Sequence, residues 1–568
     1  MAVTVNNEIK ICSDGALPLI SELCNKIELK KIIDEKIDDQ NKKIVSTGNA
    51  VKAMIMNIIV GRKPLYLVDK FYEPKDTEKL FGEGIGPEHL NDDVMGRALD
   101  ELYKIGAKKV LTETAMMSLQ KFNIPVTSIH ADTTSKSVYG DYEDCELDED
   151  VVQIKHGHNK DHRPDLKQFL FGLGVTKDKI VVIGDVSDGN KSDKAWNKDI
   201  LGELRKSMKQ YGLKDFVYVA DSAAVTEEML KALNGIENEE ITIPFVSRLP
   251  GNYSLEQNLR HRASENKNWT DIGKFSEKEN AAQYKIQTFE DELHGKKYDF
   301  IVCASDHLDT RKQKQLQKSI DAEKKTVTAA IAKFHKQEFF FEKDAQETFI
   351  LLQKELSPKY HQLELKISSK ERYEKRNRPG KPSKYDVRKK ETVYIGAIKH
   401  FEDDVKIQEL RNDAGMFVLI TNSLKNGKLS AVDTFREYKE QISVENCFQV
   451  LKDPDFIDEL FLKTPQRLEA LGYVMLMALM ILSILERNVR VALRGTKERV
   501  KIFNQLYRNQ PTGRNIIGSF EGLHMTMVLD PKTKQWQRFC TIDKFLLRLL
   551  ELAGFDADIY TKSPTLFN

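Results

Sequence analysis

The stretch that decides how this chain folds is Tyr438–Lys452, which reads YKEQISVENCFQVLK. Its polar residues recur at steps of three, four and seven, which return to one face of a helix with 3.6 residues per turn. They are Tyr438, Gln441, Glu445 and Lys452. Apolar residues between them form a stripe that can pack on a core. The spacing predicts one helix over 432–452 that presents a carboxylate between a tyrosine and a lysine.

Composition sets the outer limits on function. The chain has 568 residues, with 88 Lys plus Arg against 87 Asp plus Glu, so its net charge indicates no particular partner. Its length favours roughly three or four domains. The six cysteines form no CxxC pair, which is typical of free thiols in a reducing cytoplasm. The apolar run Leu471–Leu485 is short for a membrane span and predicts a buried core helix. We therefore expect a cytoplasmic, nucleoid-associated protein with no membrane segment.

Upstream of this helix, the sequence predicts an α/β sheet with acidic residues at strand ends. Val126–Ala131 runs into Asp132, and Phe216–Ala220 runs into Asp221. Further strands are expected at 179–184 and 243–247, with helices at 194–211 and 226–233. Ligands in such sheets gather at the carboxyl ends of the strands.

The parts around this sheet differ in composition. Residues 1–125 predict a helical domain, either a DNA-binding head or an ordinary helical domain. A core would then comprise 126–250 and 411–490, interrupted by a charged insertion at 251–410, and 491–568 would form a C-terminal region for dimerisation. Within the insertion, 370–390 holds ten Lys or Arg against three acids. This loop, with Arg376 and Arg378, predicts a DNA contact, although a solvated hairpin explains it as well.

Asp132, Asp221 and Glu445 together suggest metal chemistry. Mg²⁺ prefers hard carboxylate oxygens and bridges substrate phosphates. Two ions about 3.5–4 Å apart can activate an attacking oxygen and stabilise a leaving one. Acids at strand ends are also common, so solvated acids at sheet edges remain an alternative. The segment 184–192 lacks a lysine directly after its second glycine, which disfavours a phosphate-binding loop. The histidines at 156–162 favour contact with a DNA strand over zinc, through His158 and Arg163.

These motifs, in order, resemble those of the bacterial insertion-sequence transposases that carry a DDE triad. The family signature Y-x2-R-x3-E-x6-K resembles 438–452. Its first-aspartate motif resembles Ser128–Ser135 (SIHADTTS), its following run resembles the region around Asp161–Lys167 (DHRPDLK), and its second-aspartate motif resembles Phe216–Ser222 (FVYVADS). The likeness spans roughly 126–490. Helical heads similar to residues 1–120 occur in one branch of the family.

The resemblance implies a ribonuclease-H-like, mixed-sheet catalytic core interrupted by an insertion domain. Asp132, Asp221 and Glu445 would then bind two Mg²⁺ ions, for which Mn²⁺ can substitute, while Tyr438 and Lys452 would contact the DNA backbone. The chain departs from the signature at Gln441, where the family has arginine. Glutamine still donates hydrogen bonds but lacks the charge and the bidentate fork.

The function implied is that of a DNA transposase that cuts and joins double-stranded DNA. It would bind terminal inverted repeats, cut them with metal ions and join the 3′-ends to target DNA. A homodimer is expected because two element ends must be paired. Two alternatives stay open, a retired transposase that only binds DNA and a metal-dependent nuclease that cuts without joining.

Overall fold

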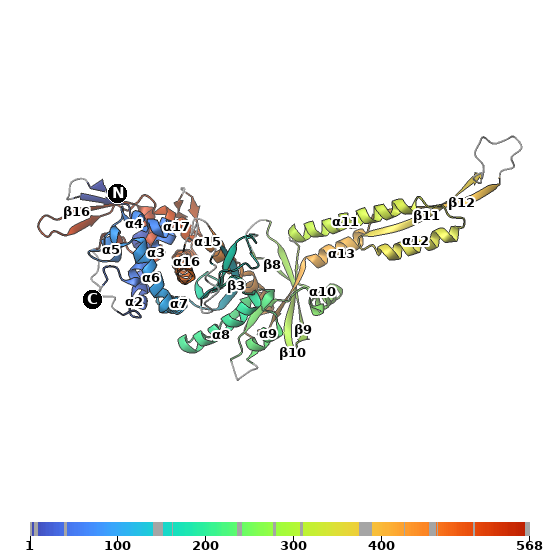
Figure 1. The fold of residues 1–568 in the computed structure, drawn as a ribbon. Coiled ribbons are helices and arrows are strands. Elements are labelled where there is room, and N and C mark those ends of the chain that lie inside the picture. Colours follow the sequence, from blue (N-terminus) through green and yellow to red (C-terminus); the bar gives the residue numbers. More distant parts are fainter. Residues whose placement is uncertain are drawn as a thin grey trace, which may run out of the picture. The chain divides into compact units, whose positions relative to one another are not determined.

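The chain divides into two compact units, which are described separately. The first unit comprises Met1–Arg248 and Thr421–Asn568, and the second comprises Leu249–Ile420. The computed structural model (Figure 1) describes residues 3–4, 9–38, 43–139, 142, 151–161, 163–235, 241–275, 280–306, 310–373, 389–424, 427–453, 462, 464–503 and 506–562. The structure is mixed α/β.

A mixed sheet forms the centre of the first unit. Its strands, in the order β5-β4-β3-β6-β7, are Val181–Asp188, Lys167–Val175, Ser128–Val138, Val217–Ala220 and Phe245–Arg248. β4 runs antiparallel to β3 and β5, whereas β6 is parallel to both β3 and β7. Helices α8 (Asp193–Tyr211) and α9 (Glu227–Asn234) connect the parallel strands in sequence. Since parallel pairing requires a crossover, these helices allow β3 and β6 to lie side by side. β6 ends directly before Asp221, but β3 continues to Val138, so Asp132 lies inside its strand and not at its end as the sequence predicted.

The sequence reasoning missed strand β4 entirely. Gly172 and Gly174 lie inside it, and glycine lowers the strand propensity of a segment. The structure explains Gly172 by packing, because a Cβ there would lie 2.0 Å from Nε1 of the buried Trp196. The glycine therefore makes room for the indole of α8 rather than marking a turn.

The remainder of the first unit is mostly helical. Its N-terminal elements are α1 Leu17–Lys26, α2 Leu29–Asp34, α3 Thr47–Met56, η2 Asn57–Gly61, η3 Leu65–Leu67, α4 Val68–Tyr72, α5 Thr77–Phe81, η4 Pro87–His89, α6 Asp92–Lys104 and α7 Ala107–Lys121. Its C-terminal elements are α16 Pro465–Leu493, α17 Gly513–Ser519, α18 Lys544–Ala553 and α19 Asp558–Thr561, with the hairpin of β14 Val500–Lys501 and β15 Tyr507–Arg508.

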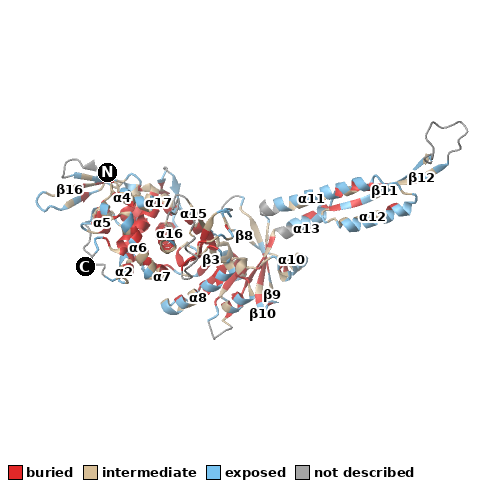
Figure 2. Cartoon of the chain, viewed as in Figure 1, coloured by how far each residue is buried: buried red, intermediate tan, exposed pale blue. Residues whose placement is uncertain are grey.

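Helix α16 is the centre of this packing. It contacts α3, α6, α7, α18 and strand β5, and Figure 2 shows buried residues along α6 and α16. Among the described residues it is the one helix long and apolar enough to cross a membrane, yet 94% of its most apolar window is buried inside the protein. It therefore serves as a core helix in this fold.

The two ends of the chain meet in a second sheet of the first unit. Its order is β1-β2-β16-β17, with β1 Val3–Thr4, β2 Ile9–Cys12, β16 Met525–Leu529 and β17 Trp536–Phe539. β2 pairs antiparallel with β16. Nearby, the buried guanidinium of Arg538 forms an ion pair with the buried carboxylate of Asp76. Residues predicted as separate N- and C-terminal domains thus lie in one compact unit.

The second unit contains the predicted insertion. Its elements are α10 Ser254–Asn266, β8 Thr270–Lys274, β9 Gln283–Leu293, β10 Lys296–Ser305, α11 Thr310–Phe334, α12 Glu342–Leu356, β11 His361–Tyr373, β12 Lys390–Glu402, α13 Asp404–Ala414 and β13 Met416–Thr421. β11 and β12 form a long antiparallel hairpin beside α11 and α12 (Figure 1). Val327, Ile331 and Leu363 belong to its small apolar core. The loop that carries Arg376 and Arg378 lies outside the described residues.

The single helix predicted over 432–452 is two helices in the structure. α14 spans Ala431–Lys439 and α15 spans Ile442–Lys452. At the junction the backbone bonds tighten to a spacing of three residues, from the Gln441 N–H to Tyr438 O (3.3 Å) and from the Ser443 N–H to Glu440 O (2.9 Å). Such tight turns interrupt a regular helix, so Tyr438 and Glu445 lie on different helices.

Candidate active site

Asp132 and Asp221 lie on neighbouring parallel strands. Ala131 of β3 and Ala220 of β6 are register partners, and each is followed directly by the aspartate. β6 ends at Ala220, where the Asp221 carboxylate caps a short 3₁₀ turn by accepting the Ala223 N–H at 3.0 Å. The two carboxylates are therefore brought together by strand pairing alone.

The electrostatics of this pair are unusual. Burial, opposed by Lys160 and reinforced by the charge of Asp221, raises the pKa of Asp132 to about 7. Burial and nearby Asp193 also raise the pKa of Asp221. The Lys160 ammonium lies 3.9 Å from Asp132 Oδ1, so one lysine only partly offsets the negative charge.

A third acid, Asp193, belongs to the same neighbourhood and was missed by the sequence reasoning. Its carboxylate lies 3.4 Å from Lys160 Nζ and accepts a hydrogen bond from the Thr133 hydroxyl. Lys160 also donates to the Thr133 carbonyl at 2.7 Å. Asp193 is the first residue of α8, after the capping Ser192. A Ser-Asp pair before a helix is a common start signal, so the sequence offered no functional reason to select it.

Glu445 lies on α15, which packs against β3 and β4. It is exposed and lines an open hollow of about 420 Å³ together with Lys452 and Thr134. Thr134 lies on β3, two positions after Asp132. Within the described part of the chain, no three His, Cys, Asp or Glu side chains form a group able to hold a metal ion. Asp132 and Asp221 are thus together, whereas Glu445 borders the same strand without completing a cluster.

The remaining residues of the helical signature take different positions. The Lys452 ammonium lies 2.5 Å from Asp161 Oδ1, which joins α15 to the 161–167 run. Gln441 is half-buried at the N-terminus of α15, and Tyr438 is half-buried near the end of α14. Lys452 therefore has a carboxylate partner that a DNA phosphate would have to replace.

The basic residues predicted to contact a DNA strand are exposed. Arg163 pairs in a bidentate way with Asp165, with Nε–Oδ1 and Nη2–Oδ2 distances of 2.9 and 2.7 Å. His156 and His158 are exposed, and His162 lies outside the described residues.

A buried histidine on the strand of Asp132 faces Glu437 of α14. The Nε2 atom of His130, which has no exposed surface, lies 3.0 Å from Ser128 Oγ and 3.7 Å from Glu437 Oε2 on α14. Burial lowers the pKa of His130 to about 4, so the ring is neutral at pH 7. At 3.7 Å from a neutral ring, Glu437 Oε2 forms neither a hydrogen bond nor an ion pair with His130, and this proximity was not anticipated from the sequence.

The acids on β3 and β6 fit a magnesium ion in chemical type. Mg²⁺ is commonly held by one or two carboxylates, with water and substrate phosphates completing its shell. Asp132 and Asp221 supply two such carboxylates, and burial, more than the charge of Asp221, raises the pKa of Asp132. Asp193 and Glu445 are the nearby acids that could add a ligand.

Comparisons with known proteins match only parts of this chain. Residues 9–116 match a family model described as "Domain of unknown function (DUF4277)". No curated protein matches the chain. Among solved structures, the chain is similar to a piggyBac transposase synaptic complex with hairpin DNA, at 8% identity and a TM-score of 0.25, over 51% of this chain. The chain covers 60% of that transposase. A likeness this low carries no argument about fold or function.

Proposed function

We propose that this protein is a DNA transposase that binds terminal inverted repeats and performs metal-dependent strand cleavage and strand transfer through a ribonuclease-H-like core. The observation that supports it most is the pairing of β3 with β6, which sets Asp132 within β3 beside Asp221 at the end of β6. The order of three antiparallel and two parallel strands also supports that core. The motif resemblance at 128–135, 216–222 and 438–452 supplies the reaction type.

In this proposal Asp132, Asp221 and Glu445 hold two Mg²⁺ ions, which when bound supply a Lewis acid for the scissile phosphate and the attacking water. The protein's own contribution is to place the two aspartates side by side through the pairing of β3 and β6. Lys160 holds the backbone at Thr133 and limits the repulsion between Asp132 and Asp193. Because the three acids form no metal-holding group among the described residues, the proposal requires Glu445 to approach the aspartates when DNA and metal bind.

In this proposal the basic residues around the acidic site contact the DNA. Lys452 would exchange Asp161 for a backbone phosphate, as a point charge. His158 and Arg163 would lie along the same strand, and Arg376 and Arg378 would follow the duplex further away. Two element ends would require a homodimer.

The test is a cleavage and joining assay with labelled duplexes bearing the terminal repeats, a target plasmid and Mg²⁺. Asp132→Asn, Asp221→Asn and Glu445→Gln should each abolish cutting while end binding persists. Asp215→Asn is the matched control, because that carboxylate is 92% exposed and lies outside the site.

Each outcome separates the candidate functions. Cut and joined products from the unaltered protein support a transposase, whereas cut ends without joining indicate a nuclease. Binding without cutting indicates a retired DNA-binding protein. Full cutting by any of the three site variants would reject the assignment of that residue.

A further inference from the structure

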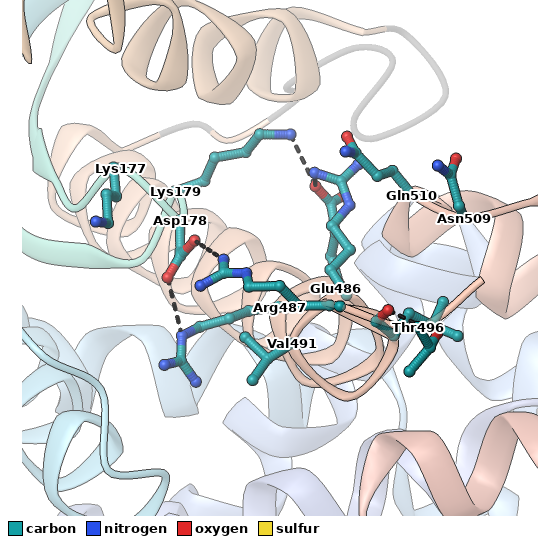
Figure 3. A pocket seen from close by; sticks show the side chains of 13 residues that line it. Lys177, Asp178, Lys179, Glu486, Arg487, Val491, Thr496, Asn509 and Gln510 are labelled. Atoms are coloured by element: carbon teal, nitrogen blue, oxygen red, sulfur yellow. Dashed lines mark hydrogen bonds and ion pairs between the residues drawn. The ribbon is translucent and has the colours of Figure 1, made fainter. Parts of the chain in front are cut away.

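A cationic pocket lies in the first unit, apart from the acids of the proposed site. Its cavity of about 330 Å³ is bordered by the turn between β4 and β5, the C-terminal part of α16 and the residues just after it (Figure 3). We call it the arginine pocket. Its charged residues are Lys177, Asp178, Lys179, Glu486, Arg487, Arg490 and Arg494. Five cations face two carboxylates, which leaves three positive charges.

One carboxylate fixes two of the cations. Glu486 lies 2.8 Å from Lys179 Nζ and 2.7 Å from Arg490 Nη1, and it accepts the Gly513 N–H at 2.9 Å. Arg490 also donates from Nε to the Pro511 carbonyl at 2.9 Å. These bonds orient the cations in advance, which reduces the entropy lost when an anion binds.

The other carboxylate, Asp178, is shared in the same way. Arg487 Nε lies 3.2 Å from it and Arg494 Nη2 lies 3.7 Å from it, as Figure 3 shows for Arg487. The Arg487 side chain is only 10% exposed. Burying a cation that shares half a carboxylate is unfavourable unless another anion completes the pairing. Lys177 adds an exposed ammonium at the rim.

The chemistry of the pocket selects its ligand. Guanidinium groups bind phosphate oxygens in a bidentate way, and an adjacent lysine adds a point charge. The turn that carries Lys177 and Lys179 also packs on α15, where Cys447 Sγ lies 3.7 Å from the Lys179 carbonyl. The turn that forms one wall of the pocket therefore contacts the helix that carries Glu445 and Lys452.

We propose that the arginine pocket binds a backbone phosphate of a DNA strand whose neighbouring part lies at α15. This inference rests on the proposed function for the identity of the anion, and it assigns a second anchoring point outside the acidic site. A strand held at two points is fixed in direction, which is what a positioned cut requires.

The test compares two double variants by DNA binding at several salt concentrations. Lys177→Gln with Arg494→Gln removes the two exposed pocket cations, and with them the 3.7 Å contact of Arg494 with Asp178. It leaves the pairs Arg487–Asp178, Lys179–Glu486 and Arg490–Glu486 intact. Lys209→Gln with Lys214→Gln removes the same charge from exposed positions on and after α8. Each lost phosphate contact should flatten the log–log salt slope by about 0.9, which is about 3-fold in affinity between 50 and 200 mM salt.

We expect the flatter slope in the pocket variant alone, with unchanged melting temperatures. Equal slopes in the unaltered protein and the pocket variant would overturn the inference, as would equal flattening by the α8 control. A calorimetric arm with inorganic phosphate and with ATP identifies the source of the anion. Binding of either that the pocket variant loses, with an unchanged DNA slope, would assign the pocket to a free anion and reject the DNA strand.

The cleavage assay keeps this result separate from the proposed function. Cutting that persists while the pocket variant keeps the full salt slope would reject only the pocket. A flattened slope in a protein that binds but never cuts would reject the transposase and retain the pocket. Absence of any DNA binding by the unaltered protein would reject both.

Discussion

Replacement of Asp132 by asparagine should make the protein more stable at neutral pH while removing its activity. Asparagine has the same shape, and its carbonyl oxygen can keep the hydrogen bond from the Thr133 N–H, which is 2.7 Å long. What changes is the charge. Burial raises the pKa of Asp132 to about 7, whereas an unfolded aspartate titrates near its ordinary value of about 3.9.

Proton linkage determines whether the free energy of unfolding rises or falls with pH. Between about pH 4 and pH 7 the folded protein retains a proton on Asp132 that the unfolded chain has lost. The free energy of unfolding therefore falls as pH rises through this window, and the full cost is present above pH 7. A shift of about three units corresponds to about 4 kcal/mol at most. Because the side chain is 25% exposed, solvent screening reduces this, and we expect about 2–4 kcal/mol.

The assay is the melting temperature of both proteins from pH 5 to pH 8, without divalent cations. For a unit of about 400 residues the unfolding entropy makes 1 kcal/mol worth about 1 °C, so Asp132→Asn should melt about 2–5 °C higher than the unaltered protein at pH 8. At pH 5, about one unit above the unfolded pKa, the difference should fall to about a third of its value at pH 8. Adding Mg²⁺ should raise the melting temperature of the unaltered protein more than that of the variant.

Asp215→Asn provides the control, since its exposed carboxylate should give no pH-dependent difference. The reasoning is refuted if Asp132→Asn differs from the unaltered protein by the same amount at pH 5 and pH 8, because the carboxylate would then titrate normally in the folded state.

Three further predictions concern packing and pairing. Arg538→Met leaves the carboxylate of the buried Asp76 without its ion-pair partner and should lower the free energy of unfolding by about 3–5 kcal/mol. Adding Asp76→Asn to the same chain should restore part of this loss. The measurement is urea unfolding, and an unchanged midpoint for Arg538→Met would contradict the prediction. Gly172→Ala places a methyl 2.0 Å from Trp196 Nε1 and should destabilise by about 1–3 kcal/mol with altered tryptophan fluorescence, and an unaltered spectrum would count against that packing. Lys452→Met should change the free energy of unfolding by less than about 1 kcal/mol, since the ion pair of Lys452 with Asp161 is partly exposed. It should flatten the log–log dependence of DNA affinity on salt by about 0.9. A slope equal to that of the unaltered protein would show that Lys452 does not contact DNA.

Local pattern was enough to predict most elements of the core. The apolar run before Asp221 predicts β6, and the periodic run at 194–211 predicts α8 within one residue of its observed start. Both signals arise from neighbours in sequence, because alternation and helical spacing reflect which faces of one segment are buried. The missed strand β4 shows the limit, since its glycines make sense only beside Trp196.

The candidate site was predictable only in part. Asp132 and Asp221 could be selected because each ends an apolar run, and Glu445 because of its helical spacing. Lys160 and Asp193 could not, as their importance comes from contacts with Thr133 that bring together three separate segments. The break at Gln441 was also unpredictable, because the 438–452 pattern fits a continuous helix equally well.

The sequence by itself determined most strands and helices of the core and the acids that follow their apolar runs, but neither β4 nor the break at Gln441. Tertiary structure alone decided that Asp132 and Asp221 are neighbours, that Glu445 stays exposed beside β3, and that β2 near the start of the chain pairs with β16 near its end. The physical reason is range. The periodicity that predicts a helix or strand involves only neighbouring residues in the sequence. The pairing of distant segments depends on the free energy of the whole packed core, which cannot be inferred from a short segment.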